Sequence, residues 1–481
     1  MRLRKRRLRG RFRLESHTRN KENELTTTTT STDTPWAAPG DENYRQATSA
    51  FNLAAHVLPA LAATATSVDE VRRLLADARE RGVGVRMHST GHAADGGAAF
   101  GGAALIRLKL DGGVVVDASE STATIPAGTT WGEVVEATAP LGLAPLHGSS
   151  PDVGAIGYLL RGGMSFYGRR YGVASNSIRS IDIVLADGSL VTVDHTRDPE
   201  LFWALRGGGG GFGIVVSATV SLVPVENVYT GAAFWPLADA PALLQAWENW
   251  CATAPNAAST SFRIMSLPPI PGLPPALSAG PVVCIDGAVV DDAGRRAVDI
   301  ADELLVPMRT YTAPLFDTWH TGTAADVATT HMDPPTPLPY RGDHLVVSPL
   351  GDDGRRALLD IAGQTDGSAL AIVELRQLGG AFAHADPRGG AFSAVQGAYA
   401  LVTVGLALGP NTVEVIAAQQ AGLRSALAPW NTGMTVPSAV ERHDAPQKTF
   451  DTATAERVDS IRRRVDPHGV FGSDRAPGAA I

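Results

Sequence analysis

The chain has 481 residues, of which 44% are hydrophobic and 19% are charged, and its formal net charge is −8. This length suits roughly two or three domains, and the acidic balance argues against general nucleic-acid binding, which needs a surplus of lysine and arginine to neutralise phosphates. We find no apolar run of about 18 residues, the length of a transmembrane helix, so no membrane association is expected. The two cysteines, Cys251 and Cys284, predict neither a disulfide framework nor a metal site, and a cytoplasmic enzyme is the default expectation.

The N-terminal segment differs in composition from the rest of the chain. Eight basic residues lie between Arg2 and Arg13, and a Thr/Ser-rich run follows at Thr26–Thr34. Such a composition predicts a disordered tail, which we place at residues 1–40. A twin-arginine export signal would need an apolar stretch after the arginines, and Glu15–Thr34 is polar.

The first ordered elements alternate between helix and strand. Ser67 to Glu70 form a capping box, and apolar residues then recur at helical spacing until Gly82. Strands are predicted at Val83–Met87, Ala104–Leu108, Val114–Ala118 and Thr122–Ala127. A second capping box at Thr130 and Glu133 begins a helix that ends near Gly142.

The loop after the first predicted strand contains small residues around a histidine, His92. Small side chains let the backbone approach a ligand closely, and a row of unshielded N–H groups can bind an anion. A histidine in such a loop could react with the ligand or bond to it. The alternative is a glycine-rich turn with a satisfied or solvent-facing histidine.

A second glycine-punctuated segment runs from His147 to Val173 and is predicted to contain few regular elements. It suits a loop that wraps an extended, phosphate-bearing ligand, or a set of tight turns. A hairpin with its turn at Asp187-Gly188 and a short helix capped by Asp198 follow. Five glycines, Gly207–Gly211, then lead into the strand at Ile214–Val223, and they predict close approach of the backbone to a flat ligand or to another chain segment. Because these glycines open a strand, they do not form a dinucleotide-binding fingerprint, and no P-loop is present.

After Pro224 the chain reads as a second α+β domain built on one sheet. Its predicted strands are Thr230–Trp235, Ser261–Met265, Val282–Val290, Leu345–Ser348, Ala371–Leu378 and Ala398–Leu406. Its predicted helices are Ala240–Cys251, Asp292–Leu305, Gly354–Ile361 and Thr412–Leu427. An amphipathic helix at Phe450–Val465 ends the chain's regular structure.

Taken in order, these segments resemble the berberine-bridge-enzyme-like FAD-linked oxidases of the vanillyl-alcohol-oxidase superfamily, of the kind found in actinobacteria. The resemblance covers about Tyr44 to Phe471 and rests on these motifs: Thr90-Gly-His92, Ser150–Gly157, Gly162-Gly163, Arg169–Gly172, Asp198–Ile214, Glu374–Gly380 and Asp466–Phe471. It implies an α+β fold with a PCMH-type FAD-binding domain of two subdomains, at residues 41–225. It further implies a substrate domain with an antiparallel sheet at residues 226–430, and a return of residues 431–481 to the FAD domain.

The resemblance also implies the cofactor and the reaction. The family oxidises an alcohol, an amine or an activated C–H bond of a small molecule, such as a sugar or a secondary-metabolite intermediate. Hydride passes to flavin N5, and O2 reoxidises the flavin. His92 matches the histidine bonded to the flavin 8α-methyl group. The residues expected to contact FAD are Ser89, Thr90, Gly91, His92, Ala93, Ser149, Ser150, Val153, Gly154, Gly157, Gly162, Gly163, Val173, Gly213 and Ile214.

The sequence departs from the family pattern at several positions. Ser150 stands where doubly linked members have a cysteine, so only the His92 link is expected. Arg161 replaces the first glycine of a usual triplet, Gly211 replaces an asparagine, and Asp474 stands in place of a late asparagine. The Tyr-x-Asn that commonly serves catalysis is matched here by Val436-Pro-Ser438, and valine cannot accept a proton.

The remaining candidates for a catalytic base are Glu374, Tyr399, Tyr167 and His331, and for each of them a structural role is the alternative. Strand alternation places Glu374 and Arg376 on one face, where Arg376 would lower the pKa of Glu374. An FAD-dependent oxidase is therefore one hypothesis. A redox-neutral cyclase on the same flavin fold is the alternative, favoured by the missing Tyr-x-Asn, and a binding protein without its cofactor is a third.

Overall fold

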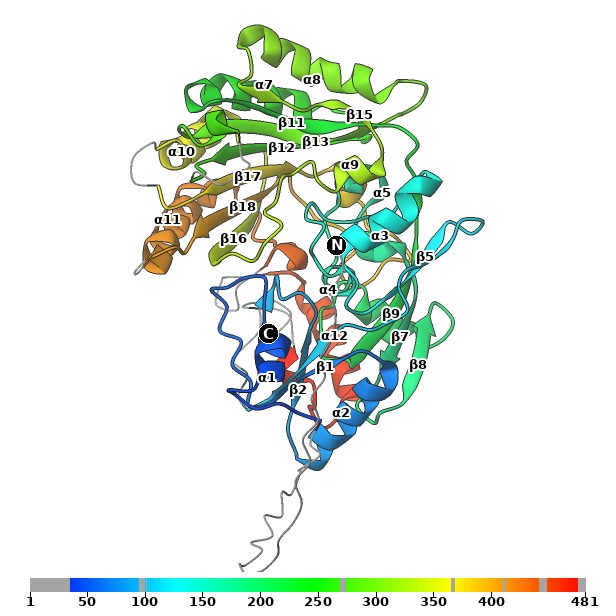
Figure 1. Ribbon diagram of the computed structural model, residues 1–481. Helices are drawn as coiled ribbons and strands as arrows, with labels where there is room; N and C mark the ends of the chain where they lie inside the picture. The colour runs from blue at the N-terminus through cyan, green and yellow to red at the C-terminus, as the bar shows by residue number, and fades with distance from the viewer. Residues whose placement is uncertain are drawn as a thin grey trace, which may run out of the picture. The chain divides into compact units, whose positions relative to one another are not determined.

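In the computed structural model, residues 35–94, 100, 102–268, 274–364, 368–409, 412–440 and 448–474 are described. The tail predicted at residues 1–40 therefore lies almost entirely outside the described residues. From Trp36 onward, helices and sheets form one unit (Figure 1). Their mixture confirms the predicted α+β class.

The first sheet carries the chain into the His92 loop. Its strands are parallel and lie in the order β1 (Ala62–Ala65), β3 (Ala104–Leu108) and β2 (Val85–His88). Helices α1 (Glu42–Thr48) and α2 (Val68–Glu80) pack on it. The side chain of Ser67 accepts a hydrogen bond from the Glu70 N–H, as the capping box predicts.

The second sheet is antiparallel and has the strand order β4-β5-β9-β7-β8. Its strands are β4 (Val115–Asp117), β5 (Thr122–Pro126), β7 (Ile178–Val184), β8 (Leu190–Asp194) and β9 (Ile214–Ser221). The predicted hairpin is confirmed, since β7 and β8 pair on either side of Asp187-Gly188. The helices that contact this sheet are α3 (Trp131–Thr138), α4 (Ala155–Leu160) and α6 (Pro199–Leu205), whereas α5 (Gly168–Tyr171) contacts the third sheet. The short strands β6 (Leu143–Ala144) and β10 (Val223–Pro224) pair with each other.

The third sheet, which we call the upper sheet, is antiparallel and has the order β14-β11-β13-β12-β17-β18-β16, with β15 also paired to β11 (Figure 1). Its strands are β11 (Val228–Pro236), β12 (Ala258–Met265), β13 (Val282–Val290), β14 (Phe316–Asp317), β15 (His320–Gly322), β16 (Tyr340–Val347), β17 (Ile372–Gln377) and β18 (Tyr399–Leu406). The accompanying helices are α7 (Ala240–Cys251), α8 (Ala297–Tyr311), α9 (Ala324–Val327), α10 (Gly351–Ala362) and α11 (Thr412–Ala426).

Strand alternation gives the upper sheet two faces of different character. Helices α7, α8, α10 and α11 cover one face, which we call the helix face. The short helices α5 and α9 contact β12 and β11, and the loop that follows α9 carries His331 onto the opposite face. Because successive residues of a strand point to opposite sides, the second face, here called the site face, holds a separate set of side chains.

The C-terminal helix α12 (Thr452–Val465) returns to α6. The Arg457 guanidinium lies 3.8 Å from the Trp203 ring centroid, and Arg464 forms an ion pair with Asp198 at 2.8 Å. Arg462 donates hydrogen bonds to the carbonyls of Gly208 and Gly210. The five-glycine run is therefore approached by another chain segment, one of the two predicted reasons for its composition.

Some elements differ from the sequence-based expectation. The segment predicted to hold few regular elements contains α4 and α5, and the structure adds α1 and β1, which were not predicted. Strand β1 is alanine-rich and has weak intrinsic strand propensity, so its pairing with β3 decides its conformation. Helix α8 continues to Tyr311 through Pro307, where the buried Met308 anchors the last turn.

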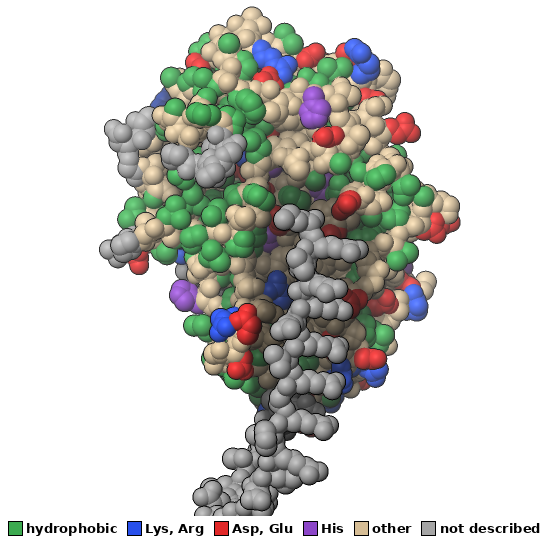
Figure 2. Space-filling view, viewed as in Figure 1, with side chains coloured by type: hydrophobic (Ala, Val, Ile, Leu, Met, Phe, Trp, Pro, Cys, Tyr) green, Lys and Arg blue, Asp and Glu red, His purple; other side chains and the backbone are tan. Residues whose placement is uncertain are grey.

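No helix in the described part of the chain is long and apolar enough to cross a bilayer. On the surface seen in Figure 2, acidic and basic side chains lie interspersed among apolar ones.

Candidate active site

The His92 loop leaves β2 and passes directly against the segment that follows α1. Gly91 has a φ of +78°, and a Cβ at this position would lie 2.6 Å from the Cα of Ala50. Glycine is therefore required both by the left-handed backbone and by the close approach. The N–H of Phe51 donates to the Thr90 carbonyl at 2.9 Å, which fixes the two segments together.

His92 is held on several sides. Its ring stacks on Phe51 with 3.8 Å between ring centroids and 15° between planes, and the Tyr340 hydroxyl donates to its carbonyl at 3.0 Å. Its Nε2 is buried and has no hydrogen-bond partner among the described residues. Burial lowers the pKa of His92 to about 4, against the opposing charge of Asp333. The imidazole is thus neutral and nucleophilic at neutral pH.

The second predicted loop meets the first one. The Gly154 N–H donates to Thr90 Oγ1 at 3.3 Å, and any side chain at Gly154 would overlap the Ser89 hydroxyl. The N–H of Trp131 donates to the Val153 carbonyl, so α3 supports this loop. The structure therefore brings together residues 89–93 and 149–154, as expected for one ligand site.

Other predicted cofactor residues are explained by packing. A side chain at Gly162 would overlap Phe392, and one at Gly163 would overlap Tyr158. Gly213 lies against the Val184 carbonyl, and Ile214 is fully buried in the pairing of β9 with β7. Gly157 has open space where a side chain would lie, and Val173 is buried near Gly162. The contacts of these residues with FAD stay predictions.

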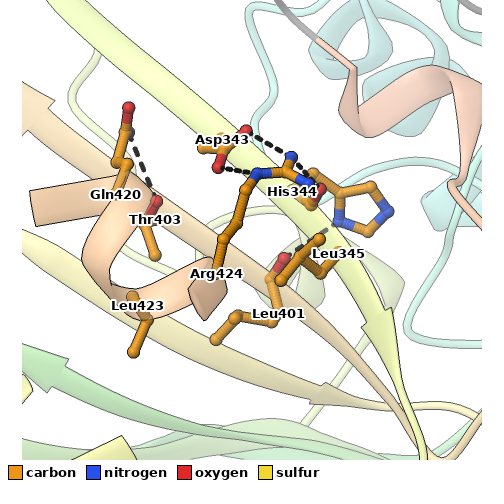
Figure 3. Close-up of a pocket in the computed structure, with 8 residues that line it drawn as sticks. All are labelled: Asp343, His344, Leu345, Leu401, Thr403, Gln420, Leu423 and Arg424. Carbon is orange, nitrogen blue, oxygen red and sulfur yellow. Dashed lines mark hydrogen bonds and ion pairs between the residues drawn. The ribbon is translucent and has the colours of Figure 1, made fainter. Parts of the chain in front are cut away.

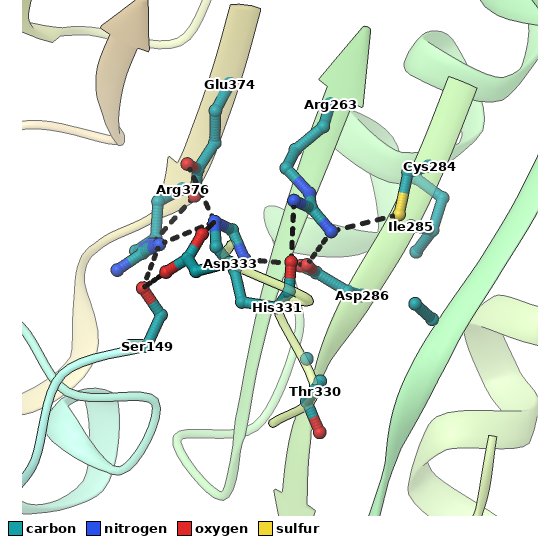
Figure 4. A network of polar contacts seen from close by, with 12 residues as sticks. Ser149, Arg263, Cys284, Ile285, Asp286, Thr330, His331, Asp333, Glu374 and Arg376 are labelled. Carbon is teal, nitrogen blue, oxygen red and sulfur yellow. Dashed lines mark hydrogen bonds and ion pairs between the residues drawn. The ribbon is translucent and has the colours of Figure 1, made fainter. Parts of the chain in front are cut away.

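The site face of the upper sheet carries a strip of charged and polar side chains (Figure 4). Arg376 of β17 is paired in register with Ser261 of β12, which is paired with Asp286 of β13. The neighbouring row consists of Glu374, Arg263 and Cys284. Directly paired residues share a face, so the pairings place all six side chains on one side of the sheet.

His331 links the two rows. Its Nδ1 lies 2.8 Å from Asp286, and its Nε2 lies 3.3 Å from Glu374. Asp286 also pairs with Arg263 at 2.6 Å, and Glu374 pairs with Arg376 at 2.8 Å. We call these residues, together with Ser149 and Asp333, the polar cluster.

The polar cluster is electrically neutral only when His331 is protonated. It contains three carboxylates, two guanidinium groups and one imidazole. Burial and the Arg263 charge oppose protonation, but Glu374, Asp333 and Asp286 outweigh them and raise the pKa of His331 to about 9. Burial also opposes ionisation of Glu374, yet Arg376 and His331 hold its pKa well below the ordinary value.

Ser149 joins the polar cluster to the second loop. Its hydroxyl lies 3.2 Å from Asp333 and 3.4 Å from Arg376 Nη2 (Figure 4). The side chain of Asp333 is 24% exposed and that of Arg376 is 13% exposed, whereas Glu374 and Asp286 are buried. Asp333 and Arg376 are thus the accessible end of the cluster.

The predicted base candidates are not gathered in one place. Glu374 and His331 lie in the polar cluster. Tyr399 pairs with Gln377 and so faces the helix side of the sheet, where its ring lies 5.0 Å from that of Trp247. Tyr167 is buried with its hydroxyl unpartnered among the described residues, and burial raises its pKa. A phenol with a raised pKa is a poor base at neutral pH.

The position matched to the family's Tyr-x-Asn also has no titratable group. Val436 is fully buried, and its N–H donates to His344 Nε2 at 3.1 Å.

On the helix face of β16 and β18, a cavity of about 10 Å³ is lined by Asp343, Thr403, Gln420 and Arg424, among others (Figure 3). This volume holds about one water molecule, so it is too small for a substrate.

Asp286, Arg263 and Asp333 were not predicted as site residues. Asp286 and Arg263 lie inside largely apolar strands, and only the register of the sheet places them on one face with Glu374. The one available signal was a buried charge in each apolar run, since an unpaired buried charge is costly.

The residues present suit a large cofactor. Buried polar atoms without a partner among the described residues include His92 Nε2 and Ser150 Oγ in the two loops, and Tyr158 OH and Arg161 Nη1 in and directly after α4. Unsatisfied buried polar groups are uncommon in proteins and point to a missing ligand or water.

Comparison with known proteins indicates a cofactor for this part of the chain. Residues 59–194 match the family model described as an FAD binding domain. This part of the chain is an FAD-binding domain. FAD is therefore its cofactor, as predicted.

The chain is also similar in sequence to a named oxidase. Over 164 residues the chain is 35% identical to (R)-6-hydroxynicotine oxidase of Paenarthrobacter nicotinovorans, a match that covers 34% of this chain and 36% of that relative. The match thus spans little more than a third of the length of that curated relative.

Solved structures extend the likeness to the whole fold. A variant of the Physcomitrella patens BBE-like 1 protein has a TM-score of 0.77 at 19% identity and covers 93% of this chain and 97% of its own. Glucooligosaccharide oxidase of Acremonium strictum, described as carrying a 6-S-cysteinyl, 8α-N1-histidyl FAD, has a TM-score of 0.72 at 21% identity and covers 93% and 97%. The predicted PCMH-type flavoprotein fold is therefore confirmed.

Proposed function

We propose that this protein is an FAD-dependent oxidase that transfers hydride from a small molecule to flavin bonded to His92, with O2 as the acceptor. The observation that carries the proposal is that the second loop, residues 149–154, contacts both the His92 loop and the polar cluster. The His92 loop contacts the second loop through Gly154, and Ser149 of that loop contacts Asp333 and Arg376 of the polar cluster. The similarity to named oxidases supports the same reaction class.

The chain's own residues have distinct roles in this proposal. Backbone N–H groups of residues 89–93 and 149–154 would bind the diphosphate, and His92 would hold the flavin covalently. Bound FAD supplies hydride acceptance and reaction with O2, and the protein supplies orientation and electrostatics. Ser150 lacks the thiol of a second link, so a single attachment at His92 is proposed.

Asp333 is our candidate for the proton acceptor. Glu374 has a strongly lowered pKa and is occupied by two cations, so it would be a weak base. Asp333 is the exposed carboxylate of the polar cluster, and its charge also acts on His92. Together with Arg376 it would bind a polar substrate such as an alcohol, a sugar or a secondary-metabolite intermediate.

A redox-neutral cyclase is the second candidate. The buried Val436 at the position of the family's tyrosine favours it, because no side chain there can accept a proton. In that case the polar cluster would stabilise charge on the substrate while the flavin's redox state stays unchanged.

The domain division is part of the proposal. We assign residues 41–225 to the FAD domain, 226–430 to the substrate domain and 431–481 to the C-terminal return, which agrees with the contacts of α12 with α6. A cytoplasmic location is proposed from the two free cysteines, Cys251 and Cys284.

The test uses purified protein and a panel of alcohols, amines, oligosaccharides and polyketide-like metabolites. An oxidase substrate should bleach the flavin without oxygen and yield H2O2 with oxygen. Asp333→Asn should slow the bleaching by roughly 10²- to 10⁴-fold, whereas Asp353→Asn, at an 81% exposed side chain on α10, should not change it. A substrate that is consumed without bleaching would contradict the oxidase and support the cyclase.

A further inference from the structure

Phe51 forms one wall of the site at which flavin attachment is proposed. Its ring lies parallel to the His92 imidazole, with centroids 3.8 Å apart. Stacked rings at this separation are in van der Waals contact. The stack therefore restricts how the imidazole can turn about its side-chain torsions.

The backbone holds Phe51 in this position from two directions. Its N–H donates to the Thr90 carbonyl at 2.9 Å, and its carbonyl accepts from the Leu338 N–H at 3.1 Å. The Leu53 N–H then donates to the Leu338 carbonyl at 3.0 Å. Phe51 is thus clamped between the His92 loop and the segment that leads into β16.

The missing side chain of Gly91 makes this arrangement possible. A Cβ there would lie 2.6 Å from the Ala50 Cα and 3.3 Å from the Phe51 nitrogen. Any larger residue would push the Phe51 segment away from the loop. The sequence pairs a glycine at position 91 with an aromatic residue at position 51, and the pair places a flat surface beneath His92.

We propose that Phe51 is a positioning residue for the covalent attachment of FAD to His92. This inference rests on the proposed function, because it assumes that His92 carries the flavin. The stack would hold the neutral imidazole in one orientation for its reaction with the 8α-methyl carbon.

Attachment in this proposal is an oxidation in which O2 is the final electron acceptor. His92 forms one nitrogen–carbon bond to the 8α carbon, which loses one hydrogen, and the imidazole loses its N–H proton. The electron pair of the broken C–H bond reduces the flavin, and O2 takes up both electrons and two protons to give H2O2. Orientation of reacting groups is a recognised contribution to such rates, and the stack supplies it here.

The experiment compares wild type with Phe51→Leu, Phe51→Tyr and Leu53→Ala. Leu53 is 59% exposed and lies in the same segment, so it serves as the matched control. Each protein is incubated with FAD and oxygen, and the fraction of flavin that stays with acid-precipitated protein is followed in time. Total bound flavin before precipitation reports whether each variant folds and binds FAD.

Phe51→Leu should bind FAD but attach it about 3- to 10-fold more slowly, since an aromatic contact is lost. Phe51→Tyr, which keeps the stack, and Leu53→Ala should attach it at the wild-type rate. Attachment by Phe51→Leu at the wild-type rate would overturn the inference, as would slow attachment by Phe51→Tyr with normal FAD binding. If Phe51→Leu does not bind FAD, Phe51→Met takes its place as the variant without the stacked ring and should attach FAD more slowly than wild type. Phe51→Tyr should still attach it at the wild-type rate. Absence of any attachment in the wild type would instead refute the covalent link itself.

Discussion

Replacing His331 by glutamine should remove a pH dependence of stability that the polar cluster creates. The pKa of His331 is raised from 6.5 to about 9 by the carboxylates around it. A group whose pKa is higher in the folded state contributes its full stability below the unfolded pKa. That contribution is then lost as the pH rises through the folded value. In the wild type we therefore expect stability to fall between pH 6.5 and pH 9.

The size of this effect follows from the shift. A rise in the pKa of His331 from 6.5 to about 9 corresponds to about 3 kcal/mol of stability, and the His331 side chain is only 5% exposed. The largest charge partner at its Nε2 is Glu374, at 3.3 Å. At an effective dielectric constant of about 20, that pair is worth about 5 kcal/mol, so Glu374→Gln should abolish most of the shift.

The assay is urea unfolding of the purified protein at several pH values from 6 to 9.5. His331→Gln and Glu374→Gln should be less stable at pH 6.5 and should show a nearly flat profile up to pH 9. His320→Gln, at a 53% exposed histidine, should keep the wild-type slope. A flat wild-type profile, or an unchanged slope in His331→Gln, would refute the charge balance described for the cluster.

Three further predictions concern other parts of the molecule. Tyr399→Phe should leave flavin reduction by a substrate within about twofold of wild type, because Tyr399 lies on the helix face; a loss of 10²-fold or more would place it in the reaction. Burial lowers the pKa of His147 and His344 to about 4. The stability that these neutral imidazoles contribute is complete above pH 6.5 and should be lost as the pH falls towards 4. A urea midpoint that stays constant from pH 7 to 4.5 would contradict this. Asp474 acts on the buried Arg161, so Arg161→Gly and Asp474→Asn should each lower the thermal midpoint, and the double variant should be more stable than additivity predicts. Strict additivity would show that the two departures from the family pattern are independent.

Local signals predicted many elements of the fold well. The predicted N-cap Ser67 begins α2, although the Glu70 carboxylate accepts from Thr66, and the complete capping box at Thr130 begins α3. The strand predicted at Val282–Val290 is β13. In each case the side-chain pattern and the terminal residues agree with the tertiary environment. Elements that depend on pairing partners, such as β1, were missed because their own residues carry little preference.

The site was predicted unevenly for a related reason. The His92 loop and the Ser149–Gly154 loop could be found because glycine and small residues mark close backbone approach within one short segment. The contact of Asp286 with His331 joins residues 45 positions apart. The alignment of Asp286 with Arg376 depends on the register of β12, β13 and β17. Tyr399 was a candidate base, yet strand alternation turns it to the helix face.

The most direct test of the account is where the flavin remains after denaturation. Purified wild-type protein is precipitated with acid, digested, and the mass of the peptide that contains His92 is measured. We expect the flavin to stay with the protein and to appear on that peptide alone, and His92→Ala to release all of it into the supernatant. Complete release of FAD from the wild type, or flavin found on a peptide without His92, would contradict the proposed site.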